Sequence, residues 1–135
     1  MADKKIETKS ISQSIVLNAS PLEVYDALMS SKKHSEFTGE EAKISNKVNG
    51  KFTAYSGYIE GESLKLTPGK IVIQSWRATD WPRGHFSKVT YTMTKKGDKT
   101  QLKFKQEGVP VDQYDSIKQG WIDYYWEPLK KMFNK

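Results

Sequence analysis

The chain has 135 residues, the length of one domain, and it is long enough to bury a substantial core. Hydrophobic residues make up 36% and aromatic residues 12%, so we expect a folded domain with a charged surface and large rings inside. The absence of cysteine excludes disulfides, thiolate zinc sites and a cysteine nucleophile. The N-terminus is polar, and no apolar run approaches the roughly 20 residues of a membrane span, so we expect a soluble, cytosolic protein with no membrane partner.

The formal net charge is +6 and is carried almost wholly by lysine, because arginine occurs only at Arg77 and Arg83. Specific nucleic-acid readers and phosphate clamps depend on the planar fork of arginine, so we expect no nucleic-acid partner. Scattered lysine is typical of a solvated surface. It can also steer a protein toward an acidic partner surface.

The first quarter of the chain predicts a tail, a strand and two helices. Residues 1–9 are expected to form a flexible tail, and Gln13–Leu17 has the β-branched residues of a strand. The segment Ser20–Glu23 predicts the start of a helix, with an N-cap serine, a proline at the first helical position and a glutamate that closes a capping box. A second short helix is expected from Ser31 to Gly39, where glycine ends it.

From Ala42 to Glu107 polar and apolar residues alternate, which predicts an antiparallel sheet with one solvent-facing side. Turn dipeptides such as Asn49-Gly50 and Pro68-Gly69 divide this region into strands. The expected strands cover residues 42–45, 51–55, 58–66, 70–78, 86–95 and 100–106.

The final segment predicts a long helix from an N-cap at Asp112 to about Phe133, with aromatic residues at helical spacing along one face. Gly120 in its interior predicts a close backbone approach, and Pro128 predicts a kink. Taken together, these elements predict a single α+β domain over residues 10–135. In it, a curved antiparallel sheet of about seven strands wraps around the terminal helix.

Motifs in three regions carry a resemblance to a known family. They are Gly50-Lys51-Phe52 with Gly57 and Gly61; Trp76-Arg77 with Trp81-Pro82-Arg83-Gly84-His85-Phe86; and Gly108-Val109-Pro110 with the terminal-helix segment Gly120–Lys130. With this element order, the chain resembles the helix-grip, START-like or birch-pollen-allergen-like superfamily. Within that superfamily it resembles the C-terminal domain of the activator of the heat-shock protein 90 ATPase.

The resemblance implies a co-chaperone rather than an enzyme. In that family the domain contacts the ATP-binding N-domains of heat-shock protein 90 and favours their closed, dimerised state, which raises ATP turnover by a population shift. We therefore expect heat-shock protein 90 as the partner, no catalytic residues, no cofactor and a monomeric chain. The alternative is a small-molecule carrier that holds an apolar ligand between the sheet and the helix, and a cyclase or hydrolase ranks behind both.

The loop between the two expected strands at 70–78 and 86–95 is the first candidate contact site. It contains Trp81, Arg83 and His85, and Trp and Arg on loops are frequent interface hot spots. We expect Trp81 to face solvent. The alternative is that Trp81 folds back to cap the end of the sheet and His85 bonds to the backbone.

Lys88, Lys103 and Lys105 are the second candidate contact group, because they alternate on adjacent strands and should share the solvent-facing side. Such a stripe can meet an acidic chaperone surface and speed association. It can equally be a solvated face that prevents edge-to-edge aggregation.

An internal cavity is the third candidate, and five aromatic residues could line it: Trp76, Tyr91, Phe104, Trp121 and Tyr125. Cavities that bind apolar ligands are mostly aromatic, but rings of this size can also simply fill a core at native packing density.

A catalytic or metal site has little support from the sequence. The carboxylates Glu60, Glu62 and Asp80 could form an acid–base set with His34 and His85, but charged residues of this kind usually lie on a solvent-exposed strand face. Two distant histidines without cysteine do not have the spacing of a metal site.

Overall fold

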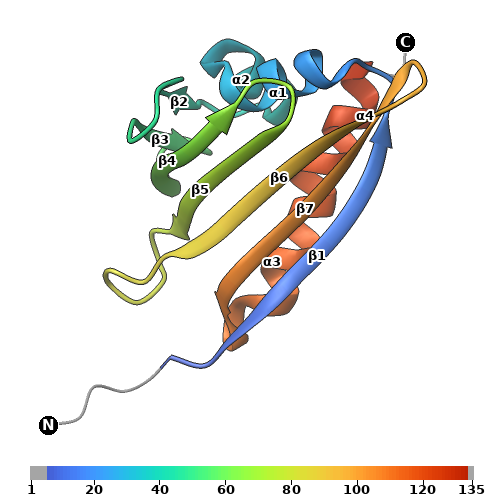
Figure 1. The fold of residues 1–135 in the computed structure, drawn as a ribbon. Helices are drawn as coiled ribbons and strands as arrows, with labels where there is room; N and C mark the ends of the chain where they lie inside the picture. Colours follow the sequence, from blue (N-terminus) through green and yellow to red (C-terminus); the bar gives the residue numbers. More distant parts are fainter. Residues whose placement is uncertain (1–5, 134–135) are drawn as a thin grey trace, which may run out of the picture.

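The computed structural model describes residues 6–133, which form a seven-stranded antiparallel sheet with the helices gathered on one side of it (Figure 1). The strands are β1 (Thr8–Leu17), β2 (Lys43–Ile44), β3 (Lys51–Ala54), β4 (Ile59–Thr67), β5 (Ile71–Ala78), β6 (Ser87–Lys96) and β7 (Lys99–Pro110). They lie in the order β1-β7-β6-β5-β4-β3-β2, so the first strand pairs with the last. The predicted α+β class and curved sheet are confirmed.

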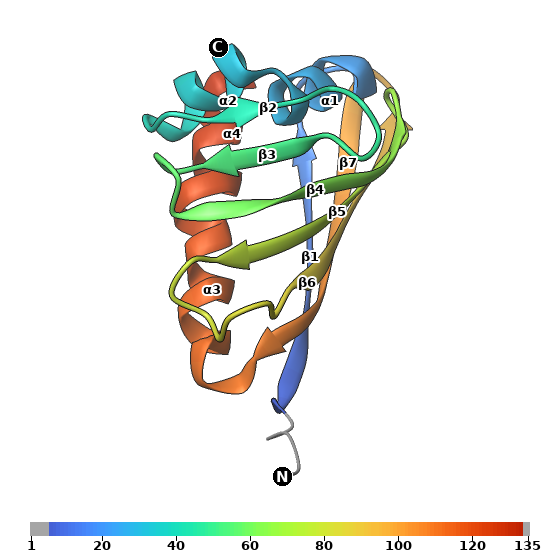
Figure 2. The same cartoon turned by 90° about the vertical axis from the view of Figure 1, so that its left-hand side faces the viewer.

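The helical elements are α1 (Pro21–Met29), α2 (Ser31–Thr38), a 3-10 turn η1 (Val111–Gln113), α3 (Tyr114–Trp121), a π-helical segment η2 (Ile122–Trp126) and α4 (Glu127–Phe133). Figure 2 shows that α3, η2 and α4 run on as one rod across the concave face of the sheet, while α1 and α2 cover one end. Among residues 6–133, no helix is both long and apolar enough to cross a membrane.

Local signals set the first two helices as expected. The hydroxyl of Ser20 accepts a hydrogen bond from the backbone N–H of Glu23, and the Glu23 carboxylate accepts one from the backbone N–H of Ser20 at 3.0 Å. This reciprocal pair satisfies donors that a helix start would leave free. Gly39 ends α2 with φ of 77°, a conformation that glycine adopts without strain.

Strands β1 and β7, which pair with each other, are both longer than predicted. Thr8 and Lys9 pair with Pro110 and Val109, because each strand supplies the hydrogen-bonding partner that extends the other. The expected tail of residues 1–9 therefore overlaps β1, and its first five residues lie outside the part that the structure describes.

The terminal helix differs from the prediction in three ways. Asp112 is not its N-cap, because Asp112 lies in η1 and no side-chain capping bond forms at either η1 or α3. At Pro128, which has no N–H, the preceding turn widens into the π-helical η2. Gly120 shows no close backbone approach, since an added Cβ would contact only the Tyr124 ring at 3.7 Å.

Aromatic rings fill the core between the rod and the concave face. Trp121 lies at their centre, with its ring centroid 4.3 Å from that of Phe104 and 4.4 Å from that of Tyr125. Its indole N–H donates to Gln106 Oε1 at 2.7 Å, and the Gln106 amide donates to the Ser87 hydroxyl at 2.9 Å. The Ser87 hydroxyl donates to the carbonyl of Trp76. A fully buried polar chain therefore joins the rod to three strands.

Candidate functional site

The loop that follows β5 folds inward. Trp81 is only 4% exposed, and its ring lies edge-on to Trp76 at 5.5 Å between centroids. The His85 ring lies 5.9 Å from that of Trp81, and its Nε2 bonds to the carbonyl of Gly108 at 2.8 Å. The expectation that Trp81 faces solvent is therefore wrong, and the alternative in which the loop caps the end of the sheet describes the structure.

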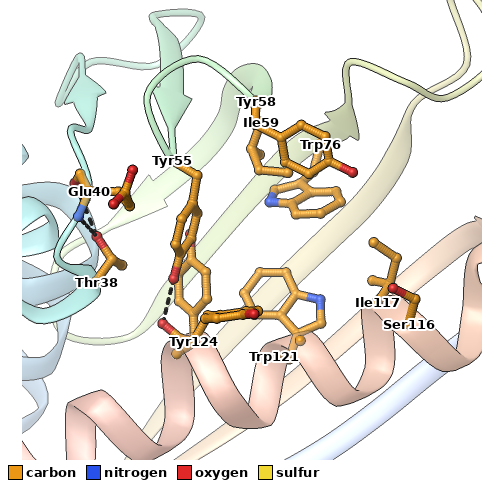
Figure 3. A pocket seen from close by; sticks show the side chains of 12 residues that line it. Thr38, Glu40, Tyr55, Tyr58, Ile59, Trp76, Ser116, Ile117, Trp121 and Tyr124 are labelled. Atoms are coloured by element: carbon orange, nitrogen blue, oxygen red, sulfur yellow. Dashed lines mark hydrogen bonds between the residues drawn. The ribbon is translucent and has the colours of Figure 1, made fainter.

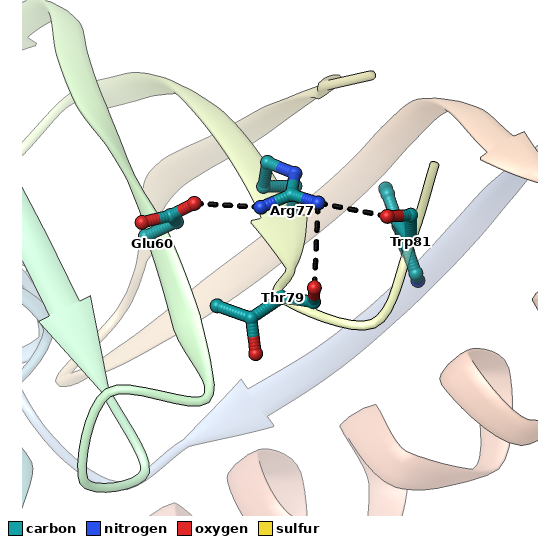
Figure 4. A network of polar contacts seen from close by, with 4 residues as sticks. All are labelled: Glu60, Arg77, Thr79 and Trp81. Atoms are coloured by element: carbon teal, nitrogen blue, oxygen red, sulfur yellow. Dashed lines mark hydrogen bonds and ion pairs between the residues drawn. The ribbon is translucent and has the colours of Figure 1, made fainter. Parts of the chain in front are cut away.

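Arg77 is the physical reason for this inward fold. Its guanidinium donates to the Glu60 carboxylate at 2.6 Å and to the backbone carbonyl of Trp81 at 2.9 Å, and it also reaches the Thr79 carbonyl (Figure 4). Arg77 is only 8% exposed, so its bond to the Trp81 carbonyl forms where water competes little, whereas the Glu60 side chain is 44% exposed. The guanidinium fork thus pins the loop to β4, and the exposed Arg83 is left at its tip.

Lys88, Lys103 and Lys105 are exposed and lie on the outer face of the sheet, as expected. The register places Thr90 opposite Lys105 and Thr92 opposite Lys103, and residues directly opposite each other share a face. Lys88 lies opposite Glu107 in the sheet, so a carboxylate stands beside the Lys88 end of this lysine group.

A cleft of about 440 Å³ opens between the β3–β4 turn, β5 and the terminal rod (Figure 3). Aromatic rings form most of its wall: Tyr55 and Tyr58 from the turn, Trp76 from β5, and Trp121, Tyr124 and Tyr125 from the rod. The remaining lining residues are Thr38, Glu40, Ile59, Ser116, Ile117 and Gly120.

The cleft includes only some of the residues predicted for a cavity. Trp76, Trp121 and Tyr125 line it, whereas Tyr91 and Phe104 lie behind Trp121 and fill the core. Tyr91 is 3% exposed, and burial raises the pKa of its hydroxyl well above the ordinary value.

Tyr55, Tyr58 and Tyr124 also line the cleft, although the sequence did not mark them as candidate site residues. Tyr124 is 58% exposed and Tyr58 is 43% exposed, and both stand at the mouth of the cleft. Tyr55 and Ser56 adopt the left-handed backbone region with φ of 51° and 55°, which turns the chain tightly between β3 and β4. Two tyrosines that flank a Ser-Gly turn were the available signal for these residues.

Hydrogen bonds fix three of the cleft tyrosines. The Tyr55 hydroxyl donates to the carbonyl of Tyr124 at 2.7 Å, and the Tyr58 hydroxyl donates to the Asp80 carboxylate at 3.0 Å. The Tyr125 hydroxyl lies 2.9 Å from Nε2 of His34. His34 Nδ1 faces the carbonyl of Leu28 at 3.1 Å, so Nδ1 carries the proton and Nε2 accepts from Tyr125. Burial lowers the pKa of His34 to about 4, which keeps the ring neutral.

The possible acid–base set does not come together. Glu60 pairs with Arg77, Glu62 lies opposite Lys51 in the sheet, and Asp80 accepts from Tyr58. His34 is buried between α2 and the rod, while His85 belongs to the capping loop. In the described part of the chain, no three side chains among His, Asp and Glu lie close enough together to hold a metal ion.

The fold is that of a helix-grip, START-like domain, in which a curved sheet closes over a terminal helix. A family model described as "Activator of Hsp90 ATPase homolog 1-like protein" matches residues 18–134. The chain belongs to this family.

Curated relatives and solved structures agree with that assignment. The chain is 33% identical over 129 residues to the human "Activator of 90 kDa heat shock protein ATPase homolog 1", covering 96% of this chain and 38% of that protein. It is 31% identical over 132 residues to the homolog from Dictyostelium discoideum, covering 97% of this chain and 34% of that protein. The chain thus spans about a third of the length of the curated relatives that it matches.

Among solved structures, an HSP90 activator from Plasmodium falciparum aligns with a TM-score of 0.88 at 22% identity, covering 93% of this chain and 96% of that one. The Aha1 dimer from Colwellia psychrerythraea aligns with a TM-score of 0.78 at 15% identity, covering 93% and 96% of the two chains. At these identities the likeness is one of fold.

Proposed function

We propose that this chain is a co-chaperone-type binding module, a monomer that binds heat-shock protein 90 and stimulates its ATPase. The observation that carries the proposal is the family match over residues 18–134, together with relatives named as activators of that ATPase. The module carries out no reaction itself. By binding the closed, N-domain-dimerised chaperone more tightly than the open one, it shifts the chaperone toward the state that hydrolyses ATP.

The outer face of the sheet is the proposed contact surface. Lys103 and Lys105 are exposed, and in residues 6–133 the ion pairs within 4 Å are Arg77–Glu60 and Lys130–Glu127, so these two lysines remain available to a partner. Lys88 and Arg83, which lies at the tip of the loop, are also exposed and add further positive charge. A surface of this sign attracts an acidic partner and speeds the encounter.

Trp81 and His85 have an indirect role in this proposal. Both hold the capping loop in place, with Trp81 packed on Trp76 and His85 bonded to Gly108. The loop then presents Arg83 in a fixed position, so truncation of Trp81 should weaken binding through disorder of the loop.

Calorimetric titration of heat-shock protein 90, closed by a non-hydrolysable nucleotide, tests the contact surface. We expect a complex at low salt that weakens as salt rises, and a loss of about tenfold or more in affinity for Lys103→Glu/Lys105→Glu. The matched control Lys32→Glu/Lys47→Glu carries the same charge change on α2 and the β2–β3 loop and should stay near the parent. Absence of binding by the parent chain at low salt would overturn the proposal.

Carriage of a small apolar ligand is the second candidate function, and the aromatic cleft of about 440 Å³ favours it. A volume of this size lies in the range of small-molecule sites, which is roughly 300–1,000 Å³. A fluorescent apolar probe that binds the protein and is displaced by an apolar compound would support this function. Failure of the probe to bind at micromolar concentrations would remove it.

A further inference from the structure

The cleft has a charge character opposite to that of the whole chain. The chain carries a net charge of +6, yet Glu40 is the one charged residue among the described side chains that line the cleft. A second carboxylate, that of Asp80, is held at the mouth by the Tyr58 hydroxyl at 3.0 Å. Two acidic groups therefore flank an opening that no described lysine or arginine lines.

The hydroxyls of three cleft tyrosines point toward acceptors within the protein. Tyr55 donates its proton to a backbone carbonyl, Tyr58 donates to a carboxylate, and Tyr125 donates to a neutral imidazole. The Trp121 indole N–H is committed to Gln106 in the core. These four donors are thus engaged within the protein and are not free to bind an anion.

The rings themselves offer electron-rich faces. Trp76 and Trp121 pack against each other with 5.5 Å between centroids and are only 4% and 2% exposed, whereas Tyr55 lies 5.8 Å from the exposed Tyr124. The faces of tryptophan and tyrosine attract cations, and they do so more strongly when water is excluded. A phenol that donates its proton to a carboxylate, as Tyr58 does, also gains electron density in its ring.

Glu40 lies on the Tyr55 side of this aromatic wall (Figure 3). Its carboxylate accepts a hydrogen bond from the Ser56 hydroxyl at 3.2 Å, which fixes it beside the turn. Burial is the main cause of the raised pKa of Tyr55, and the nearby Tyr124 and then Glu40 add to it. The carboxylate and the ring therefore act on the same region of the cleft.

We propose that this cleft is a binding site for a small organic cation, a molecule with an ammonium group on an apolar body. The ammonium group lies toward Glu40 and Tyr55, and the apolar body lies along the cleft wall formed by Trp76, Trp121 and Ile117. The cleft volume of about 440 Å³ accommodates a ligand of this kind. The proposal goes beyond chaperone binding and does not depend on it.

Titration with a matched pair of probes tests the proposal. Benzyltrimethylammonium carries the cation, and neopentylbenzene has the same shape without the charge. With tryptophan fluorescence as the readout, we expect the cation to bind about tenfold or more tightly than the neutral isostere. Glu40→Gln should weaken binding of the cation by about three- to tenfold and leave the isostere unchanged. Glu41→Gln removes the same charge from the adjacent exposed residue and should have no effect.

Equal affinity for the two probes, or tighter binding of the neutral one, would overturn the proposal. So would a Glu40→Gln variant that has an unchanged thermal midpoint and binds the cation as well as the parent. Binding of a trimethyllysine peptide without binding of the small cation would also overturn it, because the cleft would then belong to a protein partner. The assay contains no chaperone, so its failure leaves the co-chaperone proposal untouched.

Discussion

The hydroxyl of Tyr55 donates a hydrogen bond to the backbone carbonyl of Tyr124 at 2.7 Å. The α-helical partner of that carbonyl would be the N–H of residue 128, which is a proline and has none. The Tyr55 hydroxyl therefore donates to a carbonyl that cannot receive its usual α-helical hydrogen bond, because residue 128 is a proline. This hydrogen bond thus links the β3–β4 turn to the π-helical η2 and closes one wall of the cleft.

Tyr55→Phe should destabilise the protein by about 1 kcal/mol, because the ring packing remains while the hydrogen bond is lost. Chemical denaturation measures this change, and amide exchange should accelerate around η2. Tyr124→Phe is the matched control, since it leaves the carbonyl in place and removes only an exposed hydroxyl group. A loss in Tyr124→Phe equal to that in Tyr55→Phe would contradict this account.

Gln106→Leu should cost about 2–3 kcal/mol in the free energy of unfolding. The substitution leaves the buried Trp121 indole N–H without its acceptor and the Ser87 hydroxyl without its donor. Gln101→Leu on the outer face provides the control, with an expected change within about 0.5 kcal/mol. Equal stability of Gln106→Leu and the parent would mean that the buried polar chain contributes nothing.

Arg77→Lys should loosen the capping loop, because an ammonium cannot reach both Glu60 and the Trp81 carbonyl as the guanidinium fork does. We expect a loss of roughly 1–3 kcal/mol in stability and greater acrylamide quenching of tryptophan fluorescence. Arg83→Lys, at the exposed loop tip, should leave both unchanged. Quenching that stays at the parent level in Arg77→Lys would refute the pinning role.

His34 should make stability depend on pH. Burial lowers its folded pKa to about 4 from an ordinary value of 6.5, so between these values the unfolded chain binds more protons at this position than the folded one. The free energy of unfolding therefore falls as pH falls through this window, by on the order of 2 kcal/mol from this residue.

Thermal or urea unfolding at pH 7 and pH 4.5 measures this dependence. His34→Gln should reduce stability at neutral pH but flatten the pH dependence, because glutamine does not titrate. His85→Gln leaves His34 in place and should keep the slope of the parent. An unchanged slope in His34→Gln would rule out the assignment.

Features set by short-range chemistry could be predicted from the sequence. The capping box of Ser20 and Glu23 and the glycine at Gly39 act within a few residues, and the alternation from Ala42 onward reports a sheet face directly. The shared face of Lys103 and Lys105 follows from the same alternation.

Features set by distant partners could not be predicted. Trp81 looks like an exposed loop residue until Arg77 and Trp76 are placed beside it, and the cleft requires the β3–β4 turn to meet the terminal rod. Asp112 has good capping chemistry, but β7 runs on to Pro110 and the chain enters the rod through η1 instead. In each case a long-range contact outweighs a local preference.

Steady-state ATP turnover by heat-shock protein 90, measured against rising concentrations of this chain, tests the co-chaperone assignment most directly. We predict that turnover rises and then saturates, and that Lys103→Glu/Lys105→Glu shifts the rise to higher concentration while Lys32→Glu/Lys47→Glu does not. Turnover that stays at the basal rate, at concentrations where calorimetry shows the chaperone to be fully bound, would contradict it.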